Sequence, residues 1–120
     1  MKRDYKLFVQ DIFHAINDIE GFIVGMDYIQ FSGDEKTKSA VVWQIHIIGE
    51  ATKNLPKSIT DKYEELPWKY MARIRDKIAH FYFGIDYEIV WDVVKSKLPE
   101  IKPKIEKVIR ELEGEEAGEQ

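Results

Sequence analysis

The sequence predicts an all-α protein, built as an up-and-down bundle of four to five helices. Apolar residues recur at helical spacing in four stretches, and no stretch shows the strict alternation of a strand. The 120 residues fit a single domain that can bury a core without disulfides or metals. A bundle is the simplest architecture in which such helices cover one another's apolar faces.

The first predicted helix covers about residues 4–26. A loop at residues 31–34 follows it, where Ser32 or Asp34 is expected to cap the next helix. The apolar face of this first helix consists of Phe8, Ile12, Ala15, Ile16, Ile19, Ile23 and Met26.

The second predicted helix, residues 35–54, is apolar on almost every side, so we expect it at the centre of the bundle or in a subunit interface. Gly49 lies inside it and costs about 1 kcal/mol of helix stability relative to alanine. A close contact with another helix at this glycine is the expected compensation. Pro56 ends the helix.

A connector with a short helix, residues 58–66, leads to the third predicted helix, residues 67–80. Asp86 is expected to cap a fourth helix. Pro99 and Pro103 predict a break or kink before the helix resumes towards Leu112.

The charge distribution is more informative than the net charge of −4. Residues 113–120 contain four Glu and no basic residue, which predicts a disordered acidic tail after a domain at residues 1–112. Within the domain, one basic patch carries a local charge of +3 and is large enough for a few phosphates. It consists of Lys69, Arg73, Arg75 and Lys77 with Asp76, and Arg73 and Lys77 are its expected substrate-binding cations.

Several classes of protein are disfavoured by the composition. The absence of cysteine excludes disulfides and thiolate metal sites, and it favours a cytoplasmic location. No apolar stretch is long enough for a membrane span, and no signal peptide is evident. His14 and His46 have carboxylates nearby, but no tight metal-binding spacing occurs, so we expect neither a metal nor a cofactor.

The polar side of the third predicted helix carries the candidate chemistry. At about 100° per residue, Arg73, Asp76, Lys77 and His80 share one side, whereas Arg75 lies roughly 140° from His80. Arg75 and His80 therefore meet only if the helix loosens before Gly84 or if two subunits pair around a shared cleft. Symmetric pairing is the commoner solution and is preferred.

These side chains suit the cleavage of RNA, which carries its own nucleophile in the 2′-hydroxyl group. His80 can transfer a proton near neutral pH, and Arg75 can bind the developing phosphorane charge. Asp76 can orient the imidazole, and Tyr82 can stack or form a hydrogen bond. Taken alone, the same spacing also fits a solvated helix face with an Asp–His pair.

The motif residues resemble a known family. Arg75, Asp76, His80 and Tyr82 match the R-x4-H-x-Y signature of HEPN-superfamily proteins of the HepT-like toxin type. The resemblance extends over about residues 4–112, although the family often has asparagine at the position of Asp76. The surrounding segments that match, in order, are Ile48-Gly49-Glu50-Ala51, Leu55-Pro56, Leu66-Pro67-Trp68, Phe83-Gly84-Ile85-Asp86, Ile89-Val90-Trp91 and Leu98-Pro99.

The resemblance implies a dimerising helical bundle that acts as the toxin of a type VII toxin–antitoxin system. Its activity is expected to be metal-independent endoribonuclease cleavage by Arg75, His80 and Asp76 at a dimer cleft. The implied partners are RNA, a second copy of the chain and an MntA-like nucleotidyltransferase antitoxin. That antitoxin is expected to transfer AMP from ATP to Tyr82, which places a competing phosphate beside Arg75.

Alternative interpretations accompany these assignments. The chain can instead be an inert helical subunit that docks on or regulates a nucleotidyltransferase, as its acidic balance favours. Arg75 can form a surface ion pair with Glu50 or Asp86. Glu50 is expected to pair with His46 or to line the dimer cleft, and His14 is expected to be solvated or at a subunit contact. The three tryptophans are expected in the core or in an interface.

Overall fold

The computed structural model describes residues 4–79 and 84–118 of the chain. These residues form eight α-helices and one π-helical turn, with no strand among them, which confirms the all-α prediction. The body of the fold consists of the long helices α1 (Tyr5–Ile23), α3 (Glu35–Lys53) and α8 (Leu98–Gly118). None of the described helices combines the length and the apolar character needed to cross a bilayer.

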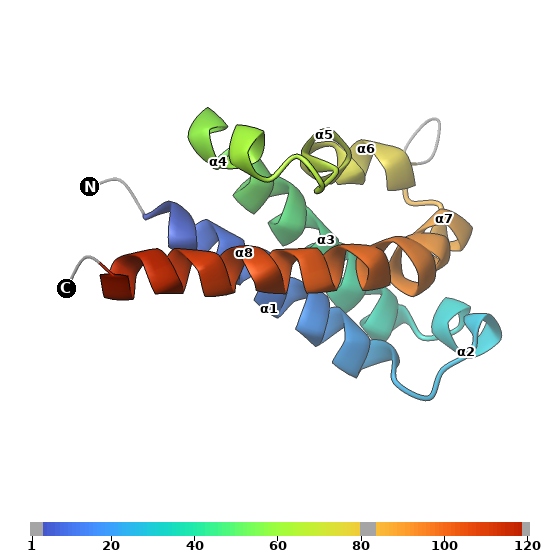
Figure 1. The fold of residues 1–120 in the computed structure, drawn as a ribbon. Helices are drawn as coiled ribbons and strands as arrows, with labels where there is room; N and C mark the ends of the chain where they lie inside the picture. Colours follow the sequence, from blue (N-terminus) through green and yellow to red (C-terminus); the bar gives the residue numbers. More distant parts are fainter. Residues whose placement is uncertain (1–3, 80–83, 119–120) are drawn as a thin grey trace.

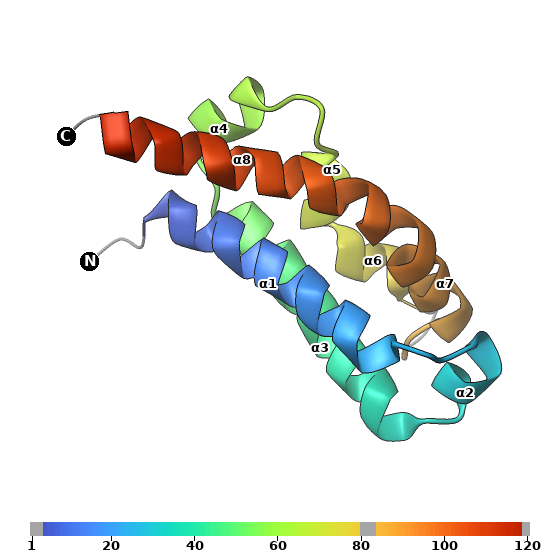
Figure 2. The same ribbon diagram turned by 60° about the horizontal axis from the view of Figure 1, so that its bottom comes forward.

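Helix α1 lies between α3 and α8 and contacts both along its length (Figures 1 and 2). The start of α1 and the end of α8 lie at one end of the molecule, and α2 (Tyr28–Ser32) and α7 (Tyr87–Asp92) lie at the other. The short helices α5 (Trp68–Ala72) and α6 (Ile74–Ile78) pack on α3. Helix α3 is therefore central, as its apolar character predicted.

Aspartates begin several of the helices. The side chain of Asp34 accepts a hydrogen bond from the backbone N–H of Thr37, which confirms Asp34 as the cap of α3. The first helix ends at Ile23, three residues earlier than predicted, because Gly25 adopts a left-handed conformation. The expected loop at residues 31–34 is partly wrong, because Asp27 caps the extra helix α2 through a capping box.

The predicted continuous helix over residues 67–80 is wrong. After the connector helix α4 (Lys57–Lys62), the segment forms two helices separated at Arg73, whose φ and ψ are −108° and 15°. The turn lets both pieces press on α3, where they bury the side chains of Met71, Ile74 and Ile78 completely. The separation of α5 from α6 is therefore a consequence of tertiary packing, and it cannot be predicted from helical periodicity.

Of the breaks or kinks predicted at Pro99 and Pro103, an irregularity is found only before Pro99, because Pro103 lies within the continuous helix α8. A π-helical turn, η1 (Val93–Lys97), precedes Pro99, and the N–H of Leu98 bonds the carbonyl of Val93. Helix α8 then continues through Pro103 to Gly118, beyond the domain end predicted at residue 112. In this last stretch Glu115 forms an ion pair with Lys62 of α4.

The three tryptophans differ in burial. Trp68 is buried and its indole N–H donates to the carbonyl of Tyr63 at 2.8 Å. Trp91 packs against Phe31 with 5.0 Å between ring centroids. Trp43, in the middle of α3, is 58% exposed, so it is not in the core of the chain, and its other expected place, an interface, stays a prediction.

Candidate functional site

Helix α6 carries the predicted motif cations and is held on α3 by two buried isoleucines. Ile74 and Ile78 are fully buried, whereas Arg75 and Asp76 between them are exposed. A Cβ atom at Gly49 of α3 would lie 3.5 Å from Cγ2 of Ile74. The contact predicted at Gly49 is thus confirmed. It sets how closely the part of α6 that carries Arg75 approaches α3.

The described part of α6 does not support the predicted helical relation between Asp76 and His80. Helix α6 ends at Ile78, and Ala79 is extended with φ −71° and ψ 136°, so four-residue helical spacing does not continue to position 80. His80 and Tyr82 themselves lie outside the residues that the structure describes. The orienting role of Asp76 therefore stays a prediction.

The segment that contains His80 and Tyr82 is anchored on both sides. Ala79 and Ile85 form an isolated antiparallel bridge, and the N–H of Asp86 donates to the carbonyl of Ile78 at 2.8 Å. Gly84 has φ +107°, a conformation that other residues rarely adopt. The side chain of Asp86 accepts from two backbone N–H groups and so begins α7 where it was predicted.

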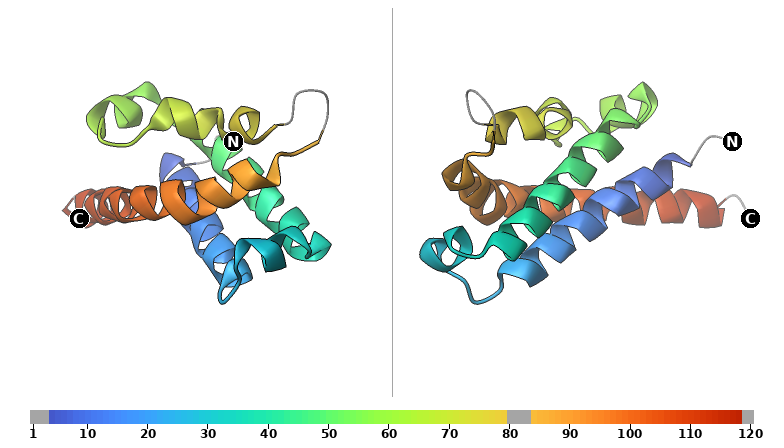
Figure 3. Two further views of the ribbon diagram at one scale, coloured as in Figure 1. Left: turned by 90° about the vertical axis from the view of Figure 1, so that its right-hand side faces the viewer. Right: turned by 180° about the vertical axis from the view of Figure 1, so that it is seen from behind.

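A hollow of about 290 Å³ lies beside Arg75. Arg75 of α6 forms one wall, Tyr87 at the start of α7 another, and α3 the rest. Helix α6 contacts both α3 and α7, and Figure 3 shows α6 and α7 at one end of the bundle. The residues that line the hollow are Ser39, Val42, Trp43, His46, Arg75 and Tyr87.

The aromatic walls of this hollow are supported by their neighbours. The rings of Trp43 and His46, one turn apart on α3, have centroids 5.4 Å apart and planes tilted by 35°. The ammonium of Lys38 lies 4.4 Å from the centroid of the Tyr87 ring and pairs with Glu35 at 2.8 Å. That hydrogen bond raises the pKa of Lys38 above its ordinary value, so Lys38 is charged at neutral pH.

Sequence reasoning did not connect the α3 residues of the hollow with Arg75. Ser39, Trp43 and His46 are spaced by four and three residues and therefore share one face of α3. This polar and aromatic stripe was present in the sequence. It was overlooked because the whole helix was interpreted as apolar on almost every side.

The basic patch is exposed to solvent at Lys69, Arg73, Arg75 and Lys77. Among the described residues, no carboxylate forms an ion pair with Arg75. Its two expected acceptors have other roles, since Glu50 pairs with Lys53 at 3.4 Å and Asp86 caps α7. The guanidinium is thus available for an external anion.

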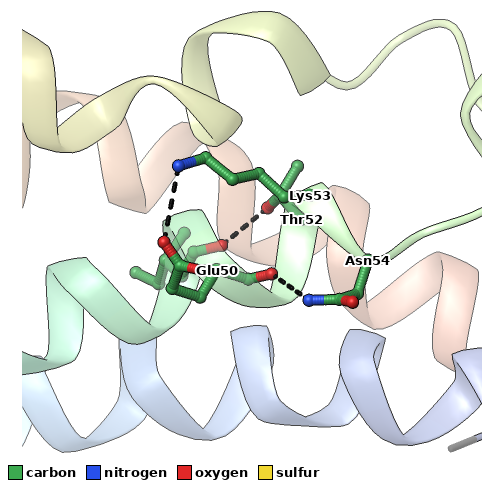
Figure 4. Close-up of polar contacts among 5 residues, drawn as sticks. Glu50, Thr52, Lys53 and Asn54 are labelled. Carbon is green, nitrogen blue, oxygen red and sulfur yellow. Dashed lines mark hydrogen bonds and ion pairs between the residues drawn. The ribbon is translucent and has the colours of Figure 1, made fainter.

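Glu50 forms its polar contacts with residues at the end of α3 and not with His46. Figure 4 shows the carboxylate of Glu50 beside the ammonium of Lys53, and the Glu50 carbonyl accepting from the side chain of Asn54 at 2.8 Å. The hydroxyl of Thr52 donates to the carbonyl of Ile48. His46 contacts Trp43 instead, so the expected His46–Glu50 pair is not the arrangement found.

Two further expectations concern the other histidine and metals. His14 on α1 is exposed, as expected, and its ring lies near Phe13 with centroids 6.1 Å apart. Within residues 4–79 and 84–118, no three histidine or carboxylate side chains gather as metal ligands would.

Comparison with known proteins places this arrangement in context. The model of the family described as "Ribonuclease HepT-like" matches residues 12–108. "Putative RNase MJ0127" of Methanocaldococcus jannaschii is 46% identical over 115 residues, which cover 96% of this chain and 95% of the relative. "Probable ribonuclease HepT" of Thermococcus cleftensis is 44% identical over 90% of this chain and 98% of its own. No solved structure matches the chain.

Proposed function

The chain belongs to the HepT-like ribonuclease family, and from that premise we propose that it is an endoribonuclease that cuts RNA without a metal ion. The observation that carries the proposal is the exposed guanidinium of Arg75, which has no carboxylate partner among the described residues. Arg75 comes shortly before Ala79, which forms a bridge with Ile85 on the far side of the segment that contains His80.

The proposed reaction uses the 2′-hydroxyl of the RNA as nucleophile. Its oxygen attacks the adjacent phosphorus while the bond to the 5′-oxygen of the next nucleotide breaks. The imidazole of His80 moves the proton between these oxygens, and the fork of Arg75 binds the extra negative charge of the phosphorane. The products are a 2′,3′-cyclic phosphate and a 5′-hydroxyl end.

Three assignments complete the proposed site. Arg73 and Lys77, both exposed beside Arg75, bind flanking phosphates of the substrate. Asp76 orients the imidazole of His80. Two copies of the chain pair around a two-fold axis, so that both motifs face one cleft.

Regulation is proposed to act on Tyr82. A nucleotidyltransferase antitoxin binds the chain, and the Tyr82 phenol oxygen attacks the α-phosphorus of ATP. A tyrosine–phosphate bond forms, pyrophosphate leaves, and the phenol proton passes to solvent. The attached AMP blocks the site by its bulk and by competing for Arg75. In this scheme the chain is the toxin of a type VII toxin–antitoxin system in the cytoplasm.

The decisive experiment measures cleavage of single-stranded RNA by purified protein in EDTA. Arg75→Ala and His80→Ala should each reduce the cleavage rate by about 10²-fold or more. Arg110→Ala and His14→Ala are matched controls, because both residues are exposed on helices outside the hollow, and they should cleave like the wild type. If all variants and the wild type are equally inactive, the chain is the inert docking subunit instead.

The modification is tested separately by intact mass. The chain is incubated with ATP and an MntA-like nucleotidyltransferase, and its mass should rise by AMP units. Tyr82→Phe should abolish the increase. An increase that persists in Tyr82→Phe would assign the modification to another residue.

A further inference from the structure

We propose that the hollow beside Arg75 is a binding site for one nucleobase of single-stranded RNA, stacked on the indole of Trp43. The inference deepens the proposed function and rests on it, since it names the form of RNA that the site accepts. It also assigns a role to Trp43 and His46, which the cleavage chemistry does not use.

The exposure of Trp43 is the first observation. Its side chain is 58% exposed in the middle of the central helix, whereas Trp68 is 9% exposed. An indole left in water forgoes the large free energy of burial that makes tryptophan a core residue. A flat ligand that covers the ring recovers part of that free energy.

The surroundings of the indole suit a flat ring. His46 lies 5.4 Å away by ring centroids, and Val42 and Tyr87 add apolar and aromatic surface. The hollow holds about 290 Å³, just below the roughly 300 Å³ at which pockets for drug-sized molecules begin. The hollow therefore has room for a single nucleobase.

The charge beside the hollow supplies the second half of the recognition. Arg75 lines the same hollow as Trp43, and its guanidinium fork matches the oxygens of a phosphate. When a base stacks on the indole, the phosphate of the same nucleotide can therefore interact with the guanidinium of Arg75. Because bases in a duplex are already stacked and paired, only an unpaired base reaches the indole.

The test measures binding of a short 2′-O-methyl RNA oligonucleotide, which lacks the attacking hydroxyl and is therefore not cut. Binding should quench tryptophan fluorescence in the wild type, and Trp43→Phe should remove most of the quenching. Trp43→Ala should weaken binding about 5- to 100-fold, the range for stacking on one aromatic ring. Phe22→Ala, at another exposed aromatic residue, should bind like the wild type.

A second oligonucleotide, abasic at every position, separates the base from the phosphate. It should bind the wild type as weakly as the intact oligonucleotide binds Trp43→Ala. Equal binding of both oligonucleotides by the wild type would overturn the base site. So would a change from dimer to monomer in Trp43→Ala by sedimentation, because the indole would then be covered by a second copy.

The outcomes distinguish this inference from the proposed function. Stacking on Trp43 without cleavage of ordinary RNA would refute the ribonuclease mechanism and leave the base site intact. Cleavage that depends on Arg75 and His80 but is unchanged in Trp43→Ala would refute the base site alone.

Discussion

Replacing Gly49 with alanine should raise the free energy of unfolding by about 0.5–1 kcal/mol, although this glycine lies at a close helix contact. A Cβ atom at position 49 would lie 3.5 Å from the Ile74 side chain, and 3.6 and 3.7 Å from the carbonyl oxygens of Met71 and Ala72. These are ordinary van der Waals distances, so a methyl group fits without moving α5 or α6. The gain in helix propensity is then kept.

A larger side chain at position 49 should have the opposite effect. The extra methyl groups of Gly49→Val must enter the space of Ile74 or the carbonyl of Met71, which costs about 1–3 kcal/mol in overpacking. Since Arg75 follows Ile74 directly, the same displacement should lower RNA cleavage. Gly49→Ala should cleave at the wild-type rate.

Urea denaturation followed by circular dichroism measures both changes. Gly21→Ala is the matched control, because Gly21 lies in α1 where an added methyl group would meet no neighbouring atom within 4 Å, so this variant reports propensity alone. A stabilised Gly21→Ala together with a destabilised Gly49→Ala would mean that α6 lies closer to α3 than the structure has it, and the reasoning would fail.

Three further predictions concern helix caps and the core. Hydrogen bonds from Thr37 lower the pKa of Asp34 below its ordinary value of 3.8. The stabilisation that they give to the folded state is therefore present above pH 3.8 and is lost as the pH falls through the pKa of the folded state. In thermal melting at several pH values, Asp34→Asn should lose less melting temperature on acidification than the wild type. Asp86→Ala should cost about 1 kcal/mol in urea denaturation, and Asp86→Ser much less. Ile12→Ala, fully buried, should cost about 2–5 kcal/mol, whereas Ile29→Ala, 81% exposed, should change stability little.

Much of the fold follows from local rules that the sequence displays. Apolar residues spaced along α1 predicted which of its faces is buried, because a helix packs the side that excludes water. Asp34 and Asp86 predicted two helix starts, since a short side-chain acceptor satisfies free N–H groups wherever the chain turns into a helix. Gly49 predicted a contact with another helix, because a glycine inside a helix lowers its stability unless packing compensates.

The sequence named candidate residues for the site, and their roles stay predictions, whereas the geometry around Arg75 was not predictable. The resemblance identified Arg75 and its neighbours from their order along the chain, and the family match agrees with it. The break at Arg73 and the end of α6 at Ile78 were not predictable, because the spacing of Met71, Ile74 and Ile78 fits one continuous helix equally well. Packing against α3 decides between the two forms.

The sequence by itself determined that the chain is helical, where most helices begin, and which residues carry charge near the motif. Only the tertiary structure decided that Trp43 and His46 face Arg75 across a hollow, because they are separated by about thirty residues and meet through the docking of α6 on α3. Periodicity reports which side of a helix is covered. It does not report which neighbour covers it or which aromatic residue is left open.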